Sequence, residues 1–264
     1  MSIPGRSLRT ALESGAPQFG LCIMYPCPGE LERIAPDWDW LWIDGQHGEM
    51  GYQDVLAMVR ACDHVGKPAL VRVASHDSGR IGLALDTAPA GVIVPLVDTP
   101  EQARAVVRAA KFPPLGGRSY AGRRTVDLHG RLFCETANDD VLLIVQIESL
   151  LAIDNAEAIA AVPGVDALFL GPDDIMLRRG FTMNTARSKD SLGPDMRAVV
   201  AACRKHGKFS MVSGGTTSEM IRHCVELGFH MIVAGGDIRF LPEASKSASK
   251  EAREVAGQFA KGTR

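Results

Sequence analysis

Eight short, almost continuously hydrophobic segments divide the chain at fairly regular intervals. They lack the alternation of polar and apolar residues that marks a strand with one wet face, so each is predicted to be a parallel strand covered on both sides. Amphipathic stretches with helical spacing lie between them, and several end near a glycine. The hydrophobic segments are FGLCIMYP (19–26), WLWIDG (40–45), PALVRV (68–73), GVIVPLV (91–97), VLLIVQIE (141–148), VDALFLGP (165–172), KFSMVSGG (208–215) and HMIVAGGD (230–237).

Repeated strand and helix units of this kind fit two architectures. Eight units in about 250 residues predict a (β/α)8 barrel, and a doubly wound open sheet of similar length is the alternative. We favour the barrel, as a single domain over residues 1–264. Two long connections, 111–140 and 175–193, are expected to be lids, binding loops or subunit contacts, or else disordered. The tail from Pro242 onward is expected to form a final helix with a frayed end.

Composition excludes several classes of partner. Hydrophobic residues make up 46% of the chain, charged residues 23%, and the formal net charge is -2, so nothing biases the protein toward nucleic acid or an anionic membrane. The six cysteines form no CxxC pair and are expected to be reduced. The N-terminus has no apolar signal region, and no apolar stretch reaches the roughly 20 residues of a membrane helix. These observations predict a cytoplasmic protein.

Polar residues gather at the predicted strand ends, whereas the strand beginnings show no such cluster. In a barrel the carboxyl ends of all strands meet at one rim, which is where the chemistry of this architecture takes place. Each residue alone has a plain structural interpretation as a cap, a turn or a surface residue, so the argument depends on their coincidence. The residues are Asp44, Gln46, His47, Arg72, Gln146, Glu148, Gly171, Asp173, Asp174, Ser213, Gly214, Gly215, Gly235, Gly236 and Asp237.

Two carboxylates, Glu148 and Asp174, follow neighbouring predicted strands and should lie close together on the rim. Two carboxylates with water and substrate oxygens suit a hard divalent ion such as Mg²⁺ or Mn²⁺. The competing interpretation is that they cap helices, as Asp174 could for a helix that follows GPDD. No Cys and His cluster has zinc-like spacing.

Three further residue types bear on the chemistry. Arg72 follows three apolar residues, a position that calls for an anionic partner, either a substrate or a structural carboxylate. His47, close to Asp44, is either a histidine satisfied in a turn or a general base oriented by a carboxylate. Lysines are missing from the strand ends, since Lys67 and Lys208 precede strands, so a Schiff base is not expected and carbonyl activation would come from a metal.

The motifs WIDGQHG, VRV, LALDTAPAGVIVPLVDTPEQARAVVRAAKFPPLGGRS, VQIES and VPGVDALFLGPDDI together resemble the HpcH/HpaI family of metal-dependent aldolases. The similarity runs from about residue 19 to 240. It implies a TIM barrel of the phosphoenolpyruvate/pyruvate-binding type, a divalent Mg²⁺, Mn²⁺ or Co²⁺ cofactor and a 2-oxo acid substrate. It also implies a hexamer, a trimer of dimers, in which the C-terminal helix can be exchanged between subunits.

The resemblance assigns roles residue by residue. It implies that Glu148 and Asp174 are the metal ligands and that Arg72 holds the keto or enolate oxygen. His47 would transfer the proton, and Asp86 would pair with it.

The same resemblance places Asp44 near metal-bound waters. Gln146 and the backbone amides from Gly171 through Asp173 to Asp174 would line the pyruvate site. Two departures concern the pocket: Gln46 stands where the family usually has Glu, and Met176 stands where it usually has Ser.

The activity that follows is a carbon-carbon lyase reaction, in which a 4-hydroxy-2-oxo acid is cleaved to pyruvate and an aldehyde through a metal-stabilised enolate. One alternative is an enzyme that decarboxylates oxaloacetate or traps its enolate as macrophomate synthase does. Another is a non-catalytic barrel, against which the complete set of site residues argues. In the connection 111–140, Arg123 or Arg124 is either part of a fold-supporting loop or, in a swapped hexamer, a selector of acidic aldehydes.

Overall fold

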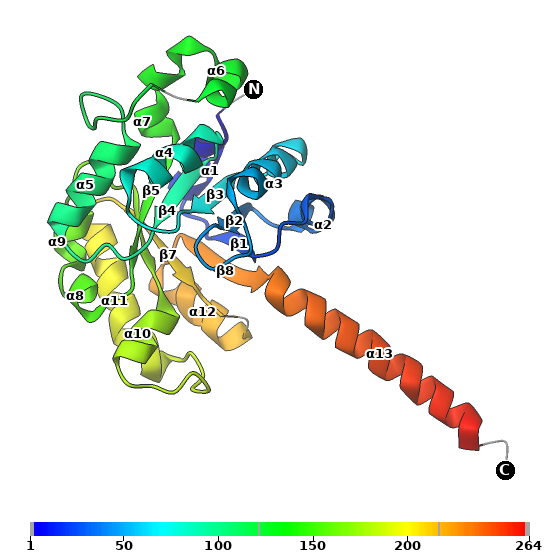
Figure 1. Ribbon diagram of the computed structural model, residues 1–264. Coiled ribbons are helices and arrows are strands. Elements are labelled where there is room, and N and C mark those ends of the chain that lie inside the picture. Colours follow the sequence, from blue (N-terminus) through cyan, green and yellow to red (C-terminus); the bar gives the residue numbers. More distant parts are fainter. Residues whose placement is uncertain (1–2, 121, 216, 262–264) are drawn as a thin grey trace.

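The computed structural model describes residues 3–120, 122–215 and 217–261, which build a closed barrel of parallel strands (Figure 1). Each strand pairs with the next along the chain, and the first pairs with the last. The predicted (β/α)8 barrel is therefore confirmed, and the open sheet is excluded because it would leave two edges unpaired. The strands are β1 (Gln18–Ile23), β2 (Trp40–Asp44), β3 (Ala69–Arg72), β4 (Gly91–Val94), β5 (Leu142–Ile147), β6 (Ala167–Leu170), β7 (Phe209–Ser213) and β8 (Met231–Gly236).

Helices surround the barrel and join the end of each strand to the start of the next (Figure 1). Their apolar faces pack on the outward side chains of the strands and form the larger hydrophobic core. They are α1 (Pro4–Glu13), α2 (Pro28–Ile34), η1 (Ala35–Asp37), α3 (Tyr52–His64), α4 (Ser78–Asp86), α5 (Pro100–Ala110), α6 (Arg123–His129), η2 (Arg131–Glu135), α7 (Ala137–Asp140), α8 (Leu150–Asp154), α9 (Ala156–Ala160), α10 (Pro172–Arg178), α11 (Lys189–Lys205), α12 (Ser218–Leu227) and α13 (Asp237–Lys261).

A second hydrophobic cluster fills the inside of the barrel. Alternate residues of a strand point to opposite faces, so Trp40 and Trp42 of β2 point inward while Leu41 and Ile43 join the outer core. Leu8 and Leu12 of α1 belong to the inner cluster, so α1 closes the end of the barrel at which the strands begin. The opposite end receives Asp44, the next inward residue of β2.

Several helix boundaries differ from the sequence prediction. The stretch 149–162 forms two short helices, α8 and α9, because the chain turns at Asn155. Helix α11 begins at Lys189, inside the predicted connection 175–193, since Ser188 caps it with its side chain. The connection 111–140 is not an open loop, because it contains α6, η2 and α7.

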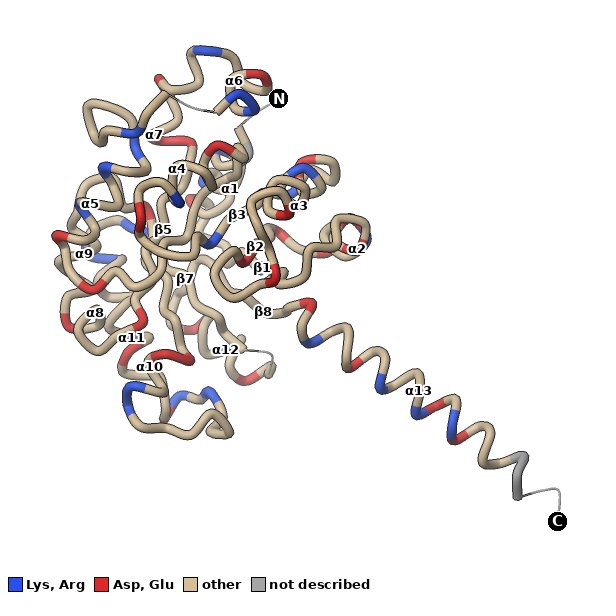
Figure 2. The backbone as a smooth tube through the Cα atoms, in the orientation of Figure 1, with Lys and Arg blue, Asp and Glu red and all other residues tan. Residues whose placement is uncertain are grey.

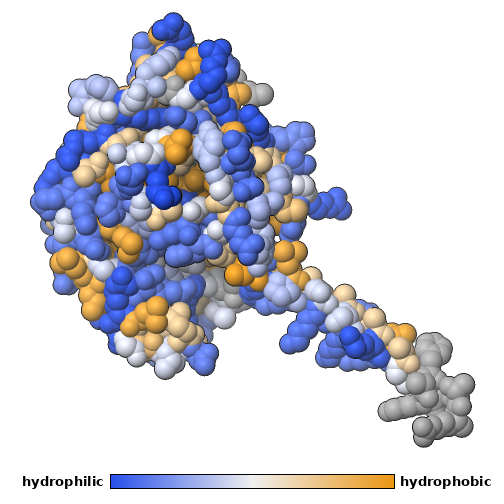
Figure 3. All heavy atoms as spheres, in the orientation of Figure 1, coloured by the Kyte–Doolittle hydropathy of each residue, from blue (hydrophilic) through white to orange (hydrophobic). Residues whose placement is uncertain are grey.

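The last helix begins earlier than predicted and leaves the barrel. Helix α13 starts at Asp237, directly after β8, and runs through Pro242. It extends far from the rest of the chain (Figure 1) and carries charges of both signs along its length (Figure 2). Hydrophilic side chains cover most of the face seen in Figure 3, with smaller hydrophobic patches between them. Among the described helices, none is long and apolar enough to cross a membrane.

Candidate active site

A cavity of about 400 Å³ opens at the carboxyl ends of the strands. It is lined by residues of β1, β2, β3, β7 and β8, by the start of α10 and by the first turn of α13. Eight residues singled out from the sequence share this cavity: Asp44, His47, Arg72, Asp173, Ser213, Gly215, Gly235 and Gly236. These polar strand ends therefore meet on one rim, whereas Gln146, Glu148 and Asp174 are not among the residues that line the cavity.

Arg72 and Asp44 form a buried, bidentate ion pair between β3 and β2. The register aligns the two residues, and Arg72 donates from Nε to Oδ1 at 2.9 Å and from Nη2 to Oδ2 at 2.5 Å. Burial raises the pKa of Asp44, but the hydrogen bonds and charge of Arg72 outweigh it and hold that pKa below its usual value. The guanidinium carbon of Arg72 also lies 4.5 Å from the centre of the Trp42 ring. The arginine is therefore fixed in place and charged.

Gln146 links this pair to Glu148. Its Oε1 lies 3.4 Å from Nη1 of Arg72, and its Nε2 donates to Oε2 of Glu148 at 2.6 Å. The other carboxylate oxygen of Glu148 accepts from the backbone N–H of Leu96 at 2.8 Å. A polar chain therefore crosses the rim from β2 to β5.

Gly171 permits the close approach of β6 to this chain. A Cβ at position 171 would stand 2.8 Å from Gln146 Nε2 and 3.1 Å from Glu148 Oε2, which no larger residue allows. The N–H of Gly171 is bound to the carbonyl of Ile147, and Pro172 has none. The donors left in this segment for a ligand are therefore the N–H groups of Asp173 and Asp174.

Glu148 and Asp174 are close enough to influence each other electrostatically. Burial raises the pKa of Glu148, and the negative charge of Asp174 raises it further, against the opposing hydrogen bond from Leu96. Asp174 lies in the first turn of α10 and pairs with Arg178 at 2.7 Å. Two like charges held together, one of them buried, fit the binding of a divalent cation. No group of three or more His, Cys, Asp or Glu side chains with the geometry of a metal site occurs among the described residues.

His47 is exposed at the mouth of the cavity, in the turn after β2. Its backbone N–H donates to Asp44 Oδ1 at 3.3 Å, as does that of Gln46 at 3.0 Å. The carboxylate of Asp44 is occupied by these two amides and by Arg72, and it holds the turn rather than the imidazole. An orienting role of Asp44 toward the ring of His47 is therefore not seen.

Asp86 lies elsewhere in this chain. It is the last residue of α4, and its carboxylate accepts from the N–H of Gly122 at 2.9 Å and from Arg118 at 3.3 Å. It lines a different cavity from His47, so the chain by itself does not bring the two residues together. Their pairing stays a prediction.

The two departures from the family motifs also have different positions. Met176 is buried in the outer hydrophobic core, so this departure takes no polar group away from the cavity. Gln46 is partly buried, and its Oε1 has no hydrogen-bond donor among the described residues. The Gln46 departure alone therefore leaves an unmatched group near the site.

Sequence reasoning missed several residues of the cavity, of which Arg187, Arg239 and Trp42 carry side-chain nitrogen donors. Arg187 donates to both oxygens of Asp173, at 3.0 and 2.6 Å, and to Ser213 Oγ at 3.2 Å. It belongs to the connection 175–193, whose unusual length was the available signal. Arg239 enters from α13, and Trp42 contributes to the cavity from inside the barrel.

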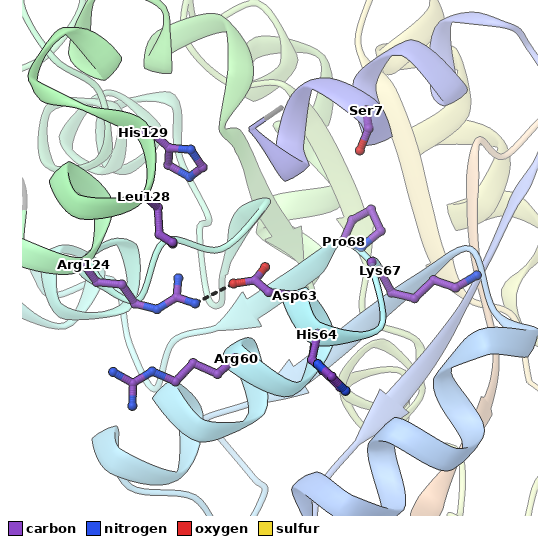
Figure 4. A pocket seen from close by; sticks show the side chains of 10 residues that line it. Ser7, Arg60, Asp63, His64, Lys67, Pro68, Arg124, Leu128 and His129 are labelled. Carbon is purple, nitrogen blue, oxygen red and sulfur yellow. Dashed lines mark hydrogen bonds and ion pairs between the residues drawn. The ribbon is translucent and has the colours of Figure 1, made fainter. Parts of the chain in front are cut away.

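A larger cavity, of about 570 Å³, lies at the opposite end of the barrel, between the end of α3, the start of β3 and α6 (Figure 4). Arg124 pairs there with Asp63 at 2.5 Å and donates to the carbonyl of Thr87 at 3.1 Å. The charged ends of Arg60 and Lys67 point in different directions, so the basic groups do not converge on one ligand (Figure 4). The smaller cavity is therefore the candidate active site.

The connection 111–140 has a structural role within this chain. Arg124 is engaged at the far end of the barrel, and the exposed Arg123 pairs with Asp127 one helical turn away. The contacts of this chain give no support to the hypothesis that either arginine selects acidic aldehydes.

The fold and the site define a class of protein: a (β/α)8-barrel enzyme with an arginine, an amide and two neighbouring carboxylates on its catalytic rim. Residues 33–244 match the model of the HpcH/HpaI aldolase/citrate lyase family, and the chain belongs to that family. Several curated relatives that match most of the chain are named aldolases, which are carbon-carbon lyases.

Individual relatives agree with this assignment. The chain is 39% identical over 217 residues to a 4-hydroxy-2-oxovalerate aldolase of Novosphingobium aromaticivorans, covering 80% of this chain and 82% of that one. An HpcH/HpaI aldolase/citrate lyase family protein from Burkholderia cenocepacia J2315 has a solved structure with a TM-score of 0.85 and 32% identity, covering 94% of this chain and 99% of that one. The structure of macrophomate synthase has a TM-score of 0.83 and 26% identity, covering 97% and 90%.

Proposed function

We propose that the protein is a divalent-metal-dependent aldolase that cleaves a 4-hydroxy-2-oxo acid to pyruvate and an aldehyde. The observation that carries this proposal is the polar chain from Asp44 through Arg72 and Gln146 to Glu148, which ends beside Asp174. It combines a fixed positive charge with a pair of carboxylates on one rim. The names of the relatives support the reaction class.

Glu148 and Asp174 hold the metal ion in this proposal. Their carboxylates are oxygen donors that suit Mg²⁺, Mn²⁺ or Co²⁺, and Gly171 leaves space at Oε2 of Glu148. When bound, the ion polarises the 2-oxo group and offsets negative charge that develops there. The N–H groups of Asp173 and Asp174 are the nearby donors for the carboxylate of the substrate.

Arg72 stabilises the oxygen at C2 as charge builds up on it. The guanidinium is held on one side by Asp44 and over the ring of Trp42, so it needs no reorganisation when the C3–C4 bond breaks. Nε and Nη2 are committed to Asp44, while Nη1 has only the long contact with Gln146. Nη1 is therefore the donor that meets the substrate.

His47 takes the proton of the C4 hydroxyl. As that proton leaves, C4 becomes the carbonyl carbon of the aldehyde, and the electrons of the C3–C4 bond form the enolate of pyruvate. Protonation at C3 then releases pyruvate. His47 is exposed at the mouth of the cavity, where it can exchange its proton with water.

A second candidate uses the same site on another substrate. An enolate formed by loss of CO₂ from oxaloacetate would meet the same arginine and metal and could be protonated or trapped. The similarity to macrophomate synthase over 97% of the chain favours this alternative. A non-catalytic barrel is disfavoured because Glu148, Asp174, Arg72 and His47 are all present.

The assembly and location form part of the proposal. The long projecting helix α13 is suited to exchange between subunits, in a hexamer built as a trimer of dimers (Figure 1). We place the protein in the cytoplasm as a single barrel domain over residues 1–264.

The test is a coupled assay for pyruvate release with Mg²⁺, across 4-hydroxy-2-oxo acids of different length and oxaloacetate. We expect release from the hydroxy-oxo acids, its loss with EDTA and its recovery with added metal. Borohydride with substrate should trap no covalent adduct. A trapped lysine adduct, or full activity in EDTA, would overturn the mechanism; release from oxaloacetate alone would establish the second candidate.

A further inference from the structure

Trp42 presents an unused hydrogen-bond donor at the candidate active site. The residue points into the barrel from β2, lines the strand-end cavity and is only 7% exposed. Its indole Nε1 is buried, and no described residue offers it an acceptor. Trp40, two residues earlier on the same strand, donates its Nε1–H to the carbonyl of Gln18 at 3.2 Å. Both tryptophans are therefore buried, but only Trp40 has a hydrogen-bond acceptor for its indole N–H among the described residues.

The ring of Trp42 is held on two sides. Phe169 packs edge-on against it with ring centres 5.3 Å apart, and the guanidinium of Arg72 lies over it at 4.5 Å. These contacts hold the ring in place. A buried donor without an acceptor is costly, so such a donor beside a binding cavity calls for a partner that arrives with the ligand.

We propose that Trp42 positions the substrate by donating its indole N–H to an oxygen of the 2-oxo acid half bound beside Arg72. The inference rests on the proposed function and adds a residue to it. Two donors of residues that line this cavity lack a strong acceptor: Nε1 of Trp42 and Nη1 of Arg72, whose contact with Gln146 is 3.4 Å. A carboxylate or enolate oxygen accepts from two donors at once, whereas an apolar group would leave both unpaired.

The experiment compares the wild type, Trp42→Phe and Trp40→Phe, each with Mg²⁺. Trp42→Phe keeps an aromatic ring under Arg72 and removes only the N–H and part of the ring. Trp40→Phe is the matched control, because it makes the same change in the same strand and removes an N–H that is bound to the protein's own backbone. The equilibrium affinities for pyruvate and for oxalate, a rigid diacid analogue of its enolate, are measured by calorimetry.

We expect Trp42→Phe to weaken both ligands about tenfold, the effect of losing one hydrogen bond to a charged group. Trp40→Phe should bind both within about twofold of the wild type, although it loses more thermal stability. Equal affinity of wild type and Trp42→Phe would overturn the inference and leave the proposed function intact. A wild type that binds neither ligand would remove the proposed function and the inference together.

A spectroscopic measurement on the unaltered protein guards against a variant that folds poorly. With ¹⁵N-labelled indoles, Trp38, Trp40 and Trp42 each give one N–H signal, which the two variants assign. Pyruvate or oxalate should move the Trp42 signal downfield, as expected for a new hydrogen bond, and slow its exchange with water. An unmoved Trp42 signal under saturating ligand would mean that the N–H does not contact the ligand, which contradicts the proposal.

Discussion

The two ends of the barrel use charge in different ways. At the end where strands begin, Lys111 donates to two backbone carbonyls and to Asp166, all between 2.7 and 2.8 Å. Arg9 binds the other oxygen of Asp166 at 2.6 Å, and Arg6 pairs with Asp140 at 2.7 Å. These charges are satisfied by the chain itself. They fasten α1 and the connection 111–140 to the bottom of the barrel.

At the end where strands finish, the charges are only partly satisfied. Arg72 is matched by Asp44, but the chain of contacts continues to Glu148, whose pKa is raised by burial and by Asp174. The donor of Trp42 is unmatched among the described residues. Groups of this kind concentrate at binding and catalytic sites. The pairing of the charged groups thus distinguishes the functional end from the structural one, although single buried atoms without a partner among the described residues occur at both, as in Thr125 and His129 opposite.

The largest expected effect comes from the carboxylate pair. Glu148→Gln keeps the size of the side chain but removes a charged metal ligand, so pyruvate release should fall by at least about 10³-fold. The amide has one acceptor oxygen for the two donors that Glu148 binds, but the repulsion from Asp174 is also lost, so the stability of the apoprotein should stay within about 1 kcal/mol of the wild type. The metal affinity, measured by calorimetry, checks the role of Glu148 as a ligand, and the unfolding midpoint in EDTA checks the stability of the apoprotein. Undiminished metal affinity would remove Glu148 from the site.

Asp44→Asn tests the best-satisfied pair at the functional end. It leaves the buried Arg72 without its counter-charge, and we expect a loss of about 3 to 4 kcal/mol in the free energy of unfolding at pH 7. The pKa of Asp44 is lowered in the folded state, so its stabilisation is complete above the unfolded pKa of about 3.9 and disappears as the pH falls through the folded pKa. The difference between variant and wild type should therefore shrink below about pH 4, as followed by urea unfolding. A pH-independent difference would contradict the charged pair.

Arg72→Lys tests the catalytic use of the same pair. Lysine cannot bind Asp44 with two parallel N–H groups and still reach the substrate. We therefore expect kcat to fall, with a rise of about 2 to 4 kcal/mol in the activation free energy. Proton exchange at C3 of pyruvate should slow in parallel, because it needs the same enolate. Exchange at the wild-type rate would show that Arg72 only supports the fold.

Arg9→Ala is the matched change at the structural end. Arg9 is partly exposed, and its loss should cost about 1 to 2 kcal/mol in stability while Lys111 still holds Asp166. The kcat of the folded enzyme should stay within about twofold of the wild type, since no described contact of Arg9 reaches the strand-end cavity. A large fall in kcat at normal stability would break the division between the two ends.

Most of the architecture could be predicted from the sequence. Near-continuous hydrophobic runs occur where a strand is buried on both faces, and all eight became barrel strands. The starts of helices α11 and α13 were predicted several residues too late. A capping residue such as Ser188, or the end of a strand, sets such a boundary more than hydrophobic periodicity does. The polar residues at strand ends were found because a hydrophobic run stops at each of them.

The sequence by itself determined which strands exist and which rim carries the chemistry, because both depend on local hydrophobic patterns repeated along the chain. Only the tertiary structure decided which residues meet. It paired Arg72 with Asp44 across strands 28 positions apart, separated Asp86 from His47 within the chain, and left the N–H of Trp42 without an acceptor among the described residues while satisfying that of Trp40. The physical reason is that hydrogen bonding depends on distance and direction to within an ångström, and barrel closure sets both.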